Sequence, residues 1–154
     1  MPEFTQIVRT LSEEKFVEVF SASPRKAREI CFQRHGIKKP KKTTRITRLG
    51  AGKGERAGML FAALKAEEDD QMVEELLRTW LLTKRSLLAA ALDHLEIAHD
   101  DGLTESEDIS RFESLSAAEI KKMAKVLKDH GSTDEIAVYL KFMGAEGVDK
   151  ALGL

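Results

Sequence analysis

The stretch from Met59 to Asp101 reads MLFAALKAEEDDQMVEELLRTWLLTKRSLLAAALDHLEIAHDD and contains neither glycine nor proline. Because these two residues are the strongest helix breakers, their absence over 43 residues predicts long helix. The apolar residues recur at the three- and four-residue spacing of a helix face. One face comprises Val73, Leu76, Leu77, Trp80 and Leu81, and the next comprises Leu88, Ala91, Leu92 and Leu95. The acidic cluster at 67–70 is the expected break between helices, and Trp80 is expected to anchor the core.

Helical patterns continue on the N-terminal side of this stretch. Apolar residues from Phe4 to Leu11 follow one helix face, and those from Phe16 to Phe20 mark a second, shorter helix. Ser23 and Pro24 predict the start of a third helix, with the serine as its cap and the proline as its first helical residue. Gly36 is in the position that ends this helix.

Three further helix starts are predicted on the C-terminal side. Each shows the spacing of a capping box, in which a hydroxyl residue is followed three positions later by glutamate. The three pairs are Thr104 with Glu107, Ser116 with Glu119, and Ser132 with Glu135. The chain is therefore predicted to be all-α, a single-domain helical bundle of about six or seven helices over residues 1–154. Its expected parts are N-terminal helices at 1–36, a basic glycine-rich linker or loop at 37–55, and an acidic helical bundle at 56–154.

Charge divides the chain near the same place. Residues 1–58 carry 14 Lys and Arg against 6 Asp and Glu, whereas residues 59–154 carry 11 against 20. Such asymmetry indicates either an anionic partner or docking of one half on the other. Between the two halves, Thr43–Leu49 shows weak strand-like alternation. A single strand would have no partner, so this stretch is expected to be loop.

Composition excludes several classes of protein. A single cysteine, Cys31, excludes an internal disulfide and any multi-cysteine zinc or iron–sulfur site, and its apolar neighbours predict a buried structural thiol. The most apolar region holds no uncharged run near the roughly 20 residues of a bilayer span, and the N-terminus lacks the order of a signal peptide. We therefore expect a cytoplasmic protein without a membrane association, a metal or a cofactor.

Motifs that would indicate catalysis are incomplete. The run Gly50–Gly58 lacks the first glycine and the final hydroxyl residue of a Walker A loop, although a helix start at about Arg56 leaves an atypical phosphate-binding loop open as an alternative. Glu96 and His99 match one half of a di-iron motif whose other half is missing. No nucleophile motif is present. A binding protein is therefore favoured over an enzyme.

The region from Lys121 to Gly144 has the outline of a helix-turn-helix, but its second helix begins with Asp134 and Glu135, and acidic residues face phosphates unfavourably. Four lysines cluster opposite the apolar face of the first of these helices: Lys121, Lys122, Lys125 and Lys128. Such a cluster is more often a solvated face than a binding site.

The basic segment between the two halves is the strongest functional signal. Residues 34–56 carry nine Lys and Arg against Glu55 alone: Arg34, Lys38, Lys39, Lys41, Lys42, Arg45, Arg48, Lys53 and Arg56. This density attracts polyanions through counterion release. No aromatic residue accompanies it, so that base stacking is absent and little sequence specificity is expected.

The sequence therefore favours a non-enzymatic binding or regulatory protein whose basic segment engages a polyanion, DNA or RNA. Three alternatives stay open. The basic segment can dock on the acidic helices of the same chain or of another copy, because residues 67–75 hold six acids and residues 86–110 hold seven acids without a lysine or arginine. The acidic helices or the Leu/Trp seam around Trp80 can serve as an adaptor surface for a protein partner. The third alternative is an enzyme that uses the atypical loop at 50–58.

Overall fold

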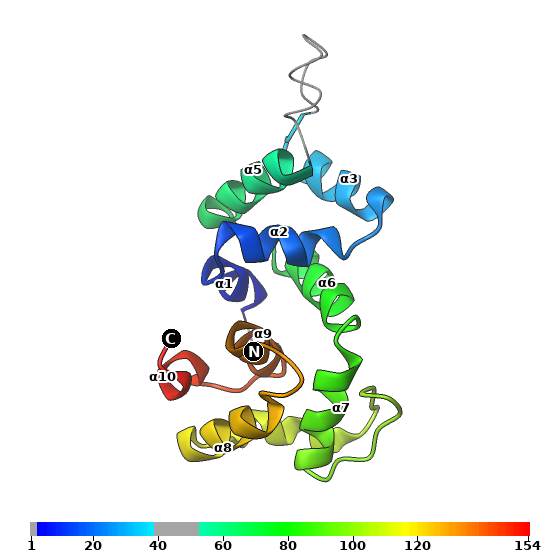
Figure 1. Ribbon diagram of the computed structural model, residues 1–154. Coiled ribbons are helices and arrows are strands. Elements are labelled where there is room, and N and C mark those ends of the chain that lie inside the picture. Colours follow the sequence, from blue (N-terminus) through cyan, green and yellow to red (C-terminus); the bar gives the residue numbers. More distant parts are fainter. Residues whose placement is uncertain (1–2, 39–52) are drawn as a thin grey trace. The chain divides into compact units, whose positions relative to one another are not determined.

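The computed structural model describes residues 3–38 and 53–154, where all regular structure is helical apart from one isolated bridge between Asp100 and Leu103 (Figure 1). The α-helices are α1 (Phe4–Arg9), α2 (Glu13–Ser21), α3 (Arg25–Arg34), α5 (Lys53–Ala66), α6 (Asp70–Leu81), α7 (Arg85–His94), α8 (Ala117–Leu127), α9 (Thr133–Phe142) and α10 (Val148–Leu152). A 3-10 helix, η1 (Glu107–Ser114), lies between α7 and α8. The all-α prediction is confirmed for these residues. No helix among them has the length and apolar character needed to cross a membrane.

Helix number exceeds the predicted six or seven in the described ranges. Seven of the α-helices have nine residues or more. The excess comes from α10, which has five residues and was not predicted, and from the separation of α6 and α7 at 82–84. A helix as short as α10 is stable only through its packing, which is why local periodicity does not identify it.

Contacts within the chain divide it into two compact units, which we call the N-terminal unit (residues 3–80) and the C-terminal unit (residues 81–154). The boundary falls after Trp80, whereas the sequence interpretation divided the chain at residues 37–55. The reason is that α5 packs against α1, α2 and α3, so the helices on both sides of the basic segment share one core. Whether the two units form a single domain depends on how they associate, so the single-domain prediction stays a prediction.

The core of the N-terminal unit is an aromatic cluster between its first helices and α5. The rings of Phe16 and Phe61 stack with centroids 5.0 Å apart, and Phe20 lies 5.1 Å from Phe32. Gly58 lies where α2 crosses α5, and a Cβ there would come within 2.3 Å of the Glu13 carboxylate. A side chain at position 58 would therefore displace the flexible carboxylate end of Glu13.

Two helix boundaries in this unit differ from those predicted. The cap of α3 is Pro24 rather than Ser23, and no side-chain hydrogen bond caps this helix. The helix α5 begins at Lys53 rather than about Arg56, so residues 53–55 of the predicted linker are helical. Glu55 in its first turn interacts favourably with the positive end of the helix dipole, which supports this earlier start.

The predicted break at the acidic cluster is confirmed, since α5 ends at Ala66 and α6 begins at Asp70. Asp69 caps α6: its carboxylate accepts a hydrogen bond from the N–H of Met72 at 3.4 Å. A second break, at 82–84 between α6 and α7, was not predicted. No glycine, proline or charge cluster marks it, and Leu82 there is exposed.

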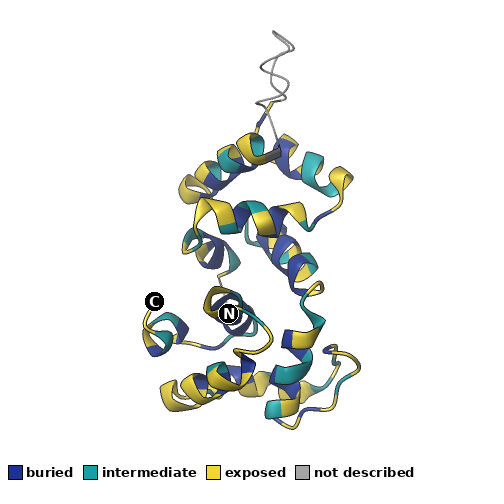
Figure 2. Ribbon diagram, in the orientation of Figure 1, coloured by how far each residue is buried: buried dark blue, intermediate teal, exposed yellow. Residues whose placement is uncertain are grey.

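In the C-terminal unit, α8 packs against α7, α9 and α10. Its buried face holds Ile120, Met123 and Leu127, each fully buried, while the opposite face is exposed (Figure 2). The rings of Phe112 and Tyr139 meet edge to face with centroids 5.8 Å apart. Because the apolar side of α8 is buried in the core, its opposite side faces solvent.

Two of the three predicted capping boxes are present. Ser116 with Glu119 starts α8, and Ser132 with Glu135 starts α9, each with both reciprocal hydrogen bonds. The third prediction is wrong, because Ser106 rather than Thr104 caps η1. The Thr104 hydroxyl instead donates to the carbonyl of Ala98 at 2.7 Å, which holds the preceding turn.

Replacing Trp80 by alanine tests the core of α6. The indole is 2 % exposed, as predicted, and it shares the buried side of the helix with Val73, Leu76 and Leu77. We expect the Trp80→Ala variant to lose about 3–5 kcal/mol of unfolding free energy, because a large cavity replaces the ring. Urea denaturation followed by circular dichroism measures this loss. The exposed Gln71→Ala variant on the same helix is the control and should change stability by less than about 0.5 kcal/mol; equal effects of the two variants would contradict the assignment.

Candidate nucleic-acid interface

The described residues include only part of the predicted basic segment. Five of its members lie outside them: Lys39, Lys41, Lys42, Arg45 and Arg48. The loop predicted at Thr43–Leu49 and the glycines at 50 and 52 also lie outside. Lys53 is the first residue of α5. The side chains of Arg34, Lys38 and Arg56 are described, and they show how the segment leaves and rejoins the N-terminal unit.

The segment leaves through the C-terminus of α3. Gly36 adopts a positive φ of 66°. The N–H of Gly36 then donates to the carbonyl of Gln33, and the N–H of Ile37 donates to that of Phe32 at 2.9 Å. These two bonds form a Schellman motif, which confirms Gly36 as the end of the helix. Ile37 is buried, whereas Lys38 is exposed, so the chain emerges from the core between these two residues.

Arg34 is bound to a carboxylate of the same unit. Its Nε and Nη2 atoms donate to the two oxygens of Asp69 at 3.0 and 2.8 Å. His35 Nε2 lies 3.0 Å from the same carboxylate, and His35 Nδ1 lies 3.5 Å from an oxygen of Glu67. We call Arg34, His35, Glu67 and Asp69 the α3 clasp. It joins the end of α3 to the turn between α5 and α6.

Arg56 holds the point where the segment returns. Its guanidinium donates to Glu29 on α3 at 2.9 Å and to the carbonyl of Ile37 at 3.4 Å. The same group lies 4.0 Å from the centroid of the Phe32 ring, within range of a cation–π interaction. The first turn of α5 is therefore fixed beside the end of α3. Ile37 and Arg56, on either side of residues 39–52, are therefore in contact.

Electrostatics at the α3 clasp favour the ionised carboxylate. Burial of the Asp69 side chain would raise its pKa, but hydrogen bonds from Arg34 and His35, the charge of Arg34 and the N–H of Met72 together outweigh burial. The pKa of Asp69 is therefore lowered from its ordinary value. The clasp is therefore a structural ion pair, and its arginine, Arg34, is the first residue of the basic segment.

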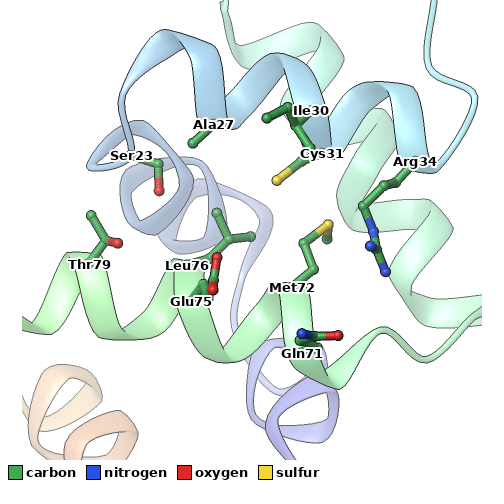
Figure 3. Close-up of a pocket in the computed structure, with 10 residues that line it drawn as sticks. All are labelled: Ser23, Ala27, Ile30, Cys31, Arg34, Gln71, Met72, Glu75, Leu76 and Thr79. Carbon is green, nitrogen blue, oxygen red and sulfur yellow. The ribbon is translucent and has the colours of Figure 1, made fainter.

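A groove lies between α3 and α6 beside Arg34, with a volume of about 220 Å³ (Figure 3). Cys31 on α3 points into it from one side, and Met72 and Leu76 on α6 point into it from the other. Ile30 on its rim is 51 % exposed. Burial raises the pKa of Cys31, as does the charge of Asp69, against a smaller lowering by Arg34. A thiol with a raised pKa is a poor nucleophile, so the groove does not resemble a catalytic site.

The half-motif of Glu96 and His99 is not part of a metal site among the described residues. His99 Nε2 lies 2.7 Å from Asp93, and its Nδ1 accepts the N–H of Gly102 at 3.0 Å, so the ring supports a turn. Within residues 3–38 and 53–154, no group of three or more His, Cys, Asp or Glu side chains is placed to hold a metal ion. The prediction of no metal therefore stays a prediction for the whole chain.

One polar pair was not found from the sequence. The Ser86 hydroxyl and His130 Nδ1 lie 2.5 Å apart, joining the start of α7 to the residues after α8. The two residues are 44 positions apart, so no sequence motif links them. Both side chains are exposed. We assign it no catalytic role.

The Asp69→Asn variant tests the α3 clasp through its pH dependence. Because the pKa of Asp69 is lower in the folded protein, its stabilisation is fully present above the unfolded value of about 3.9 and is lost as the pH falls through the folded value. The variant should unfold with about 1–2 kcal/mol less free energy at pH 7, and the difference should shrink below about pH 4. Urea unfolding between pH 3 and 7 measures it. The exposed Glu75→Gln variant is the control, and a difference independent of pH would exclude the ion pair.

Thiol labelling tests the position of Cys31. The side chain is 5 % exposed and its pKa is raised, so a thiol reagent should react slowly with the native protein and rapidly after unfolding in urea. Immediate stoichiometric labelling of the native protein would show instead that the groove opens and exposes the thiol.

Comparison with known proteins yields no relative. No protein-family model matches the chain, and neither a curated protein nor a solved structure matches it. Function is therefore inferred from the charge, geometry and chemistry of the chain's own residues.

Proposed function

We propose that the chain is a non-enzymatic nucleic-acid-binding protein whose basic segment contacts the phosphate backbone. The observation that carries this proposal is the charge of residues 34–56, with nine basic residues and one acid. A segment of this charge density gains free energy by releasing the counterions condensed on a polyphosphate.

The contacts at the two ends of the segment refine the proposal. Arg34 and Arg56 both bind carboxylates of the same unit, Asp69 and Glu29. Their main role in the proposal is to anchor the segment. The phosphate contacts are assigned chiefly to the other seven basic residues: Lys38, Lys39, Lys41, Lys42, Arg45, Lys53 and Arg48. Of these, Lys38 is described with an exposed side chain.

Recognition of this kind discriminates little between sequences. Residues 34–56 contain no Phe, Tyr or Trp on which a base could stack. Lysine contacts to phosphate position a protein on nucleic acid without reading its bases. We therefore propose similar affinities for unrelated DNA or RNA sequences of equal length.

Docking of the basic segment on the chain's own acids is the second candidate. The ion pairs Arg34–Asp69 and Arg56–Glu29 favour it, because they show this chemistry at both ends of the segment. The adaptor alternative now depends on the acidic helices alone, since Trp80 and its neighbours are buried. For the enzyme alternative, residues 53–58 form the start of α5 rather than a loop.

Salt dependence tests the proposal. If four to six basic residues contact phosphates, log affinity for a DNA duplex should fall against log salt with a slope of about −3.6 to −5.4. Replacing Lys38, Lys39, Lys41 and Lys42 by glutamine should weaken binding to all sequences alike and flatten this slope, with little change in melting temperature. Fluorescence anisotropy of a labelled duplex at several salt concentrations measures the affinity and the slope, and thermal unfolding followed by circular dichroism measures the melting temperature.

A matched control separates local contacts from net charge. The double variant Lys41→Gln/Lys42→Gln removes the same charge as Arg25→Gln/Lys26→Gln, whose side chains are exposed on α3. Only the first should change the slope. Absence of binding at low salt would exclude the proposal. A quadruple variant that unfolds at a lower temperature would favour docking on the chain's own acids.

A further inference from the structure

The C-terminal unit carries a second basic surface, on α8. Lys121, Lys122, Lys125 and Lys128 are all exposed on this helix or at its end. Lys125 is two positions from both Met123 and Leu127, which are fully buried. At 3.6 residues per turn it is therefore directed away from the core, with the other lysines on either side of it. We call these four residues the α8 lysine face.

This face is free of compensating ion pairs in the part of the chain that the structure describes. Other lysines of the same unit are paired: Lys84 lies 2.8 Å from Glu135, and Lys141 lies 2.6 Å from Asp149. The acids closest in sequence are Glu119, which is engaged in a capping box, and Asp129 at the end of the face. Four lysines against these two acids leave a net positive surface.

A small cavity of about 260 Å³ borders the face at Lys122. Arg111 also lines this cavity and donates to the carbonyl of Leu95. Glu119 lines it too, and its negative charge offsets one of the two positive charges there. The cavity is therefore not a strong anion site by itself, and the surface of interest is the outer row Lys121, Lys125 and Lys128.

The residue types of the α8 lysine face favour a polyphosphate over a protein as its partner. Protein interfaces are depleted in lysine and depend on buried aromatic or arginine anchors. The α8 lysine face has no aromatic residue, and its exposed apolar residue is Val126, which is 45 % exposed. A polyphosphate requires no apolar anchor. The row from Lys121 to Lys128 spans about 10 Å along the helix, which matches two or three successive phosphates of one duplex strand.

We infer that the α8 lysine face is a second phosphate-backbone contact, which binds a nucleic-acid duplex independently of the basic segment. Its choice of partner rests on the proposed function, but its residues belong to the other unit. A nucleic acid that binds both surfaces at once would be held more tightly than by either surface alone.

Lysine acetylation of the whole wild-type protein, with and without a 20-base-pair DNA duplex at low salt, locates the contact directly. Mass spectrometry should show protection of Lys121, Lys125 and Lys128, and none of Lys150, which is exposed on α10. The Lys121→Gln/Lys125→Gln/Lys128→Gln variant should flatten the salt slope by about 1.8 to 2.7. The control Arg25→Gln/Lys26→Gln/Lys150→Gln removes the same charge and should leave the slope near that of the wild type.

The outcomes separate this inference from the proposed function. Protection of the α8 lysine face supports the inference even if variants of the basic segment bind normally. Binding by the wild type without protection, and with an unchanged slope in the α8 variant, would overturn the inference alone. Protection by poly-glutamate but not by the duplex would also overturn it, since the partner would then be an acidic protein segment. Because the footprint uses the wild-type protein, a variant that fails to fold does not affect this decision.

Discussion

The carboxylate of Asp69 is the interaction on which the N-terminal unit depends. It accepts hydrogen bonds from Arg34 and His35 at the end of α3 and from the N–H of Met72 in the first turn of α6. The Asp69 N–H donates in turn to the hydroxyl of Thr5 on α1 at 3.1 Å. Asp69, in the turn between α5 and α6, thus joins α1, α3 and α6. A charged hydrogen-bond network of this kind is costly to leave half satisfied, so it specifies one arrangement more strictly than apolar packing does.

Ion pairs of the N-terminal unit also engage two of its arginines. Arginine matches a carboxylate and a phosphate with the same planar fork, so an arginine held by a carboxylate is already committed. Arg34 and Arg56 are committed in this way, at the two ends of the basic segment. The lysines of α8 differ, because packing fixes only the helix that carries them. Among the described residues, Arg34 and Arg56 therefore hold helices together, whereas the lysines of α8 are exposed on the surface.

Helices were predictable where the signal is local. The faces of α6 and α8 follow from apolar spacing, and the capping boxes at Ser116 and Ser132 follow from two residues three positions apart. Thr104 has the same spacing, but its hydroxyl donates to the carbonyl of Ala98, six residues earlier in the chain. The α3 clasp joins residues 35 positions apart, and no sequence pattern encodes such a distance. The charge of the candidate interface was predictable, whereas the ion pairs of Arg34 with Asp69 and of Arg56 with Glu29 were not.

The contact between Arg56 and the carbonyl of Ile37 joins residues 19 positions apart, so it closes a loop in the chain. The entropic cost of closing a loop grows slowly with its length, by about 0.6 kcal/mol for each doubling. The hydrogen bond of Arg56 to Ile37, its ion pair with Glu29 and its position over the Phe32 ring offset this cost. The N-terminal unit can therefore accept insertions between α3 and α5 at little cost in stability, whereas an insertion within either helix would shift the residues that make these contacts.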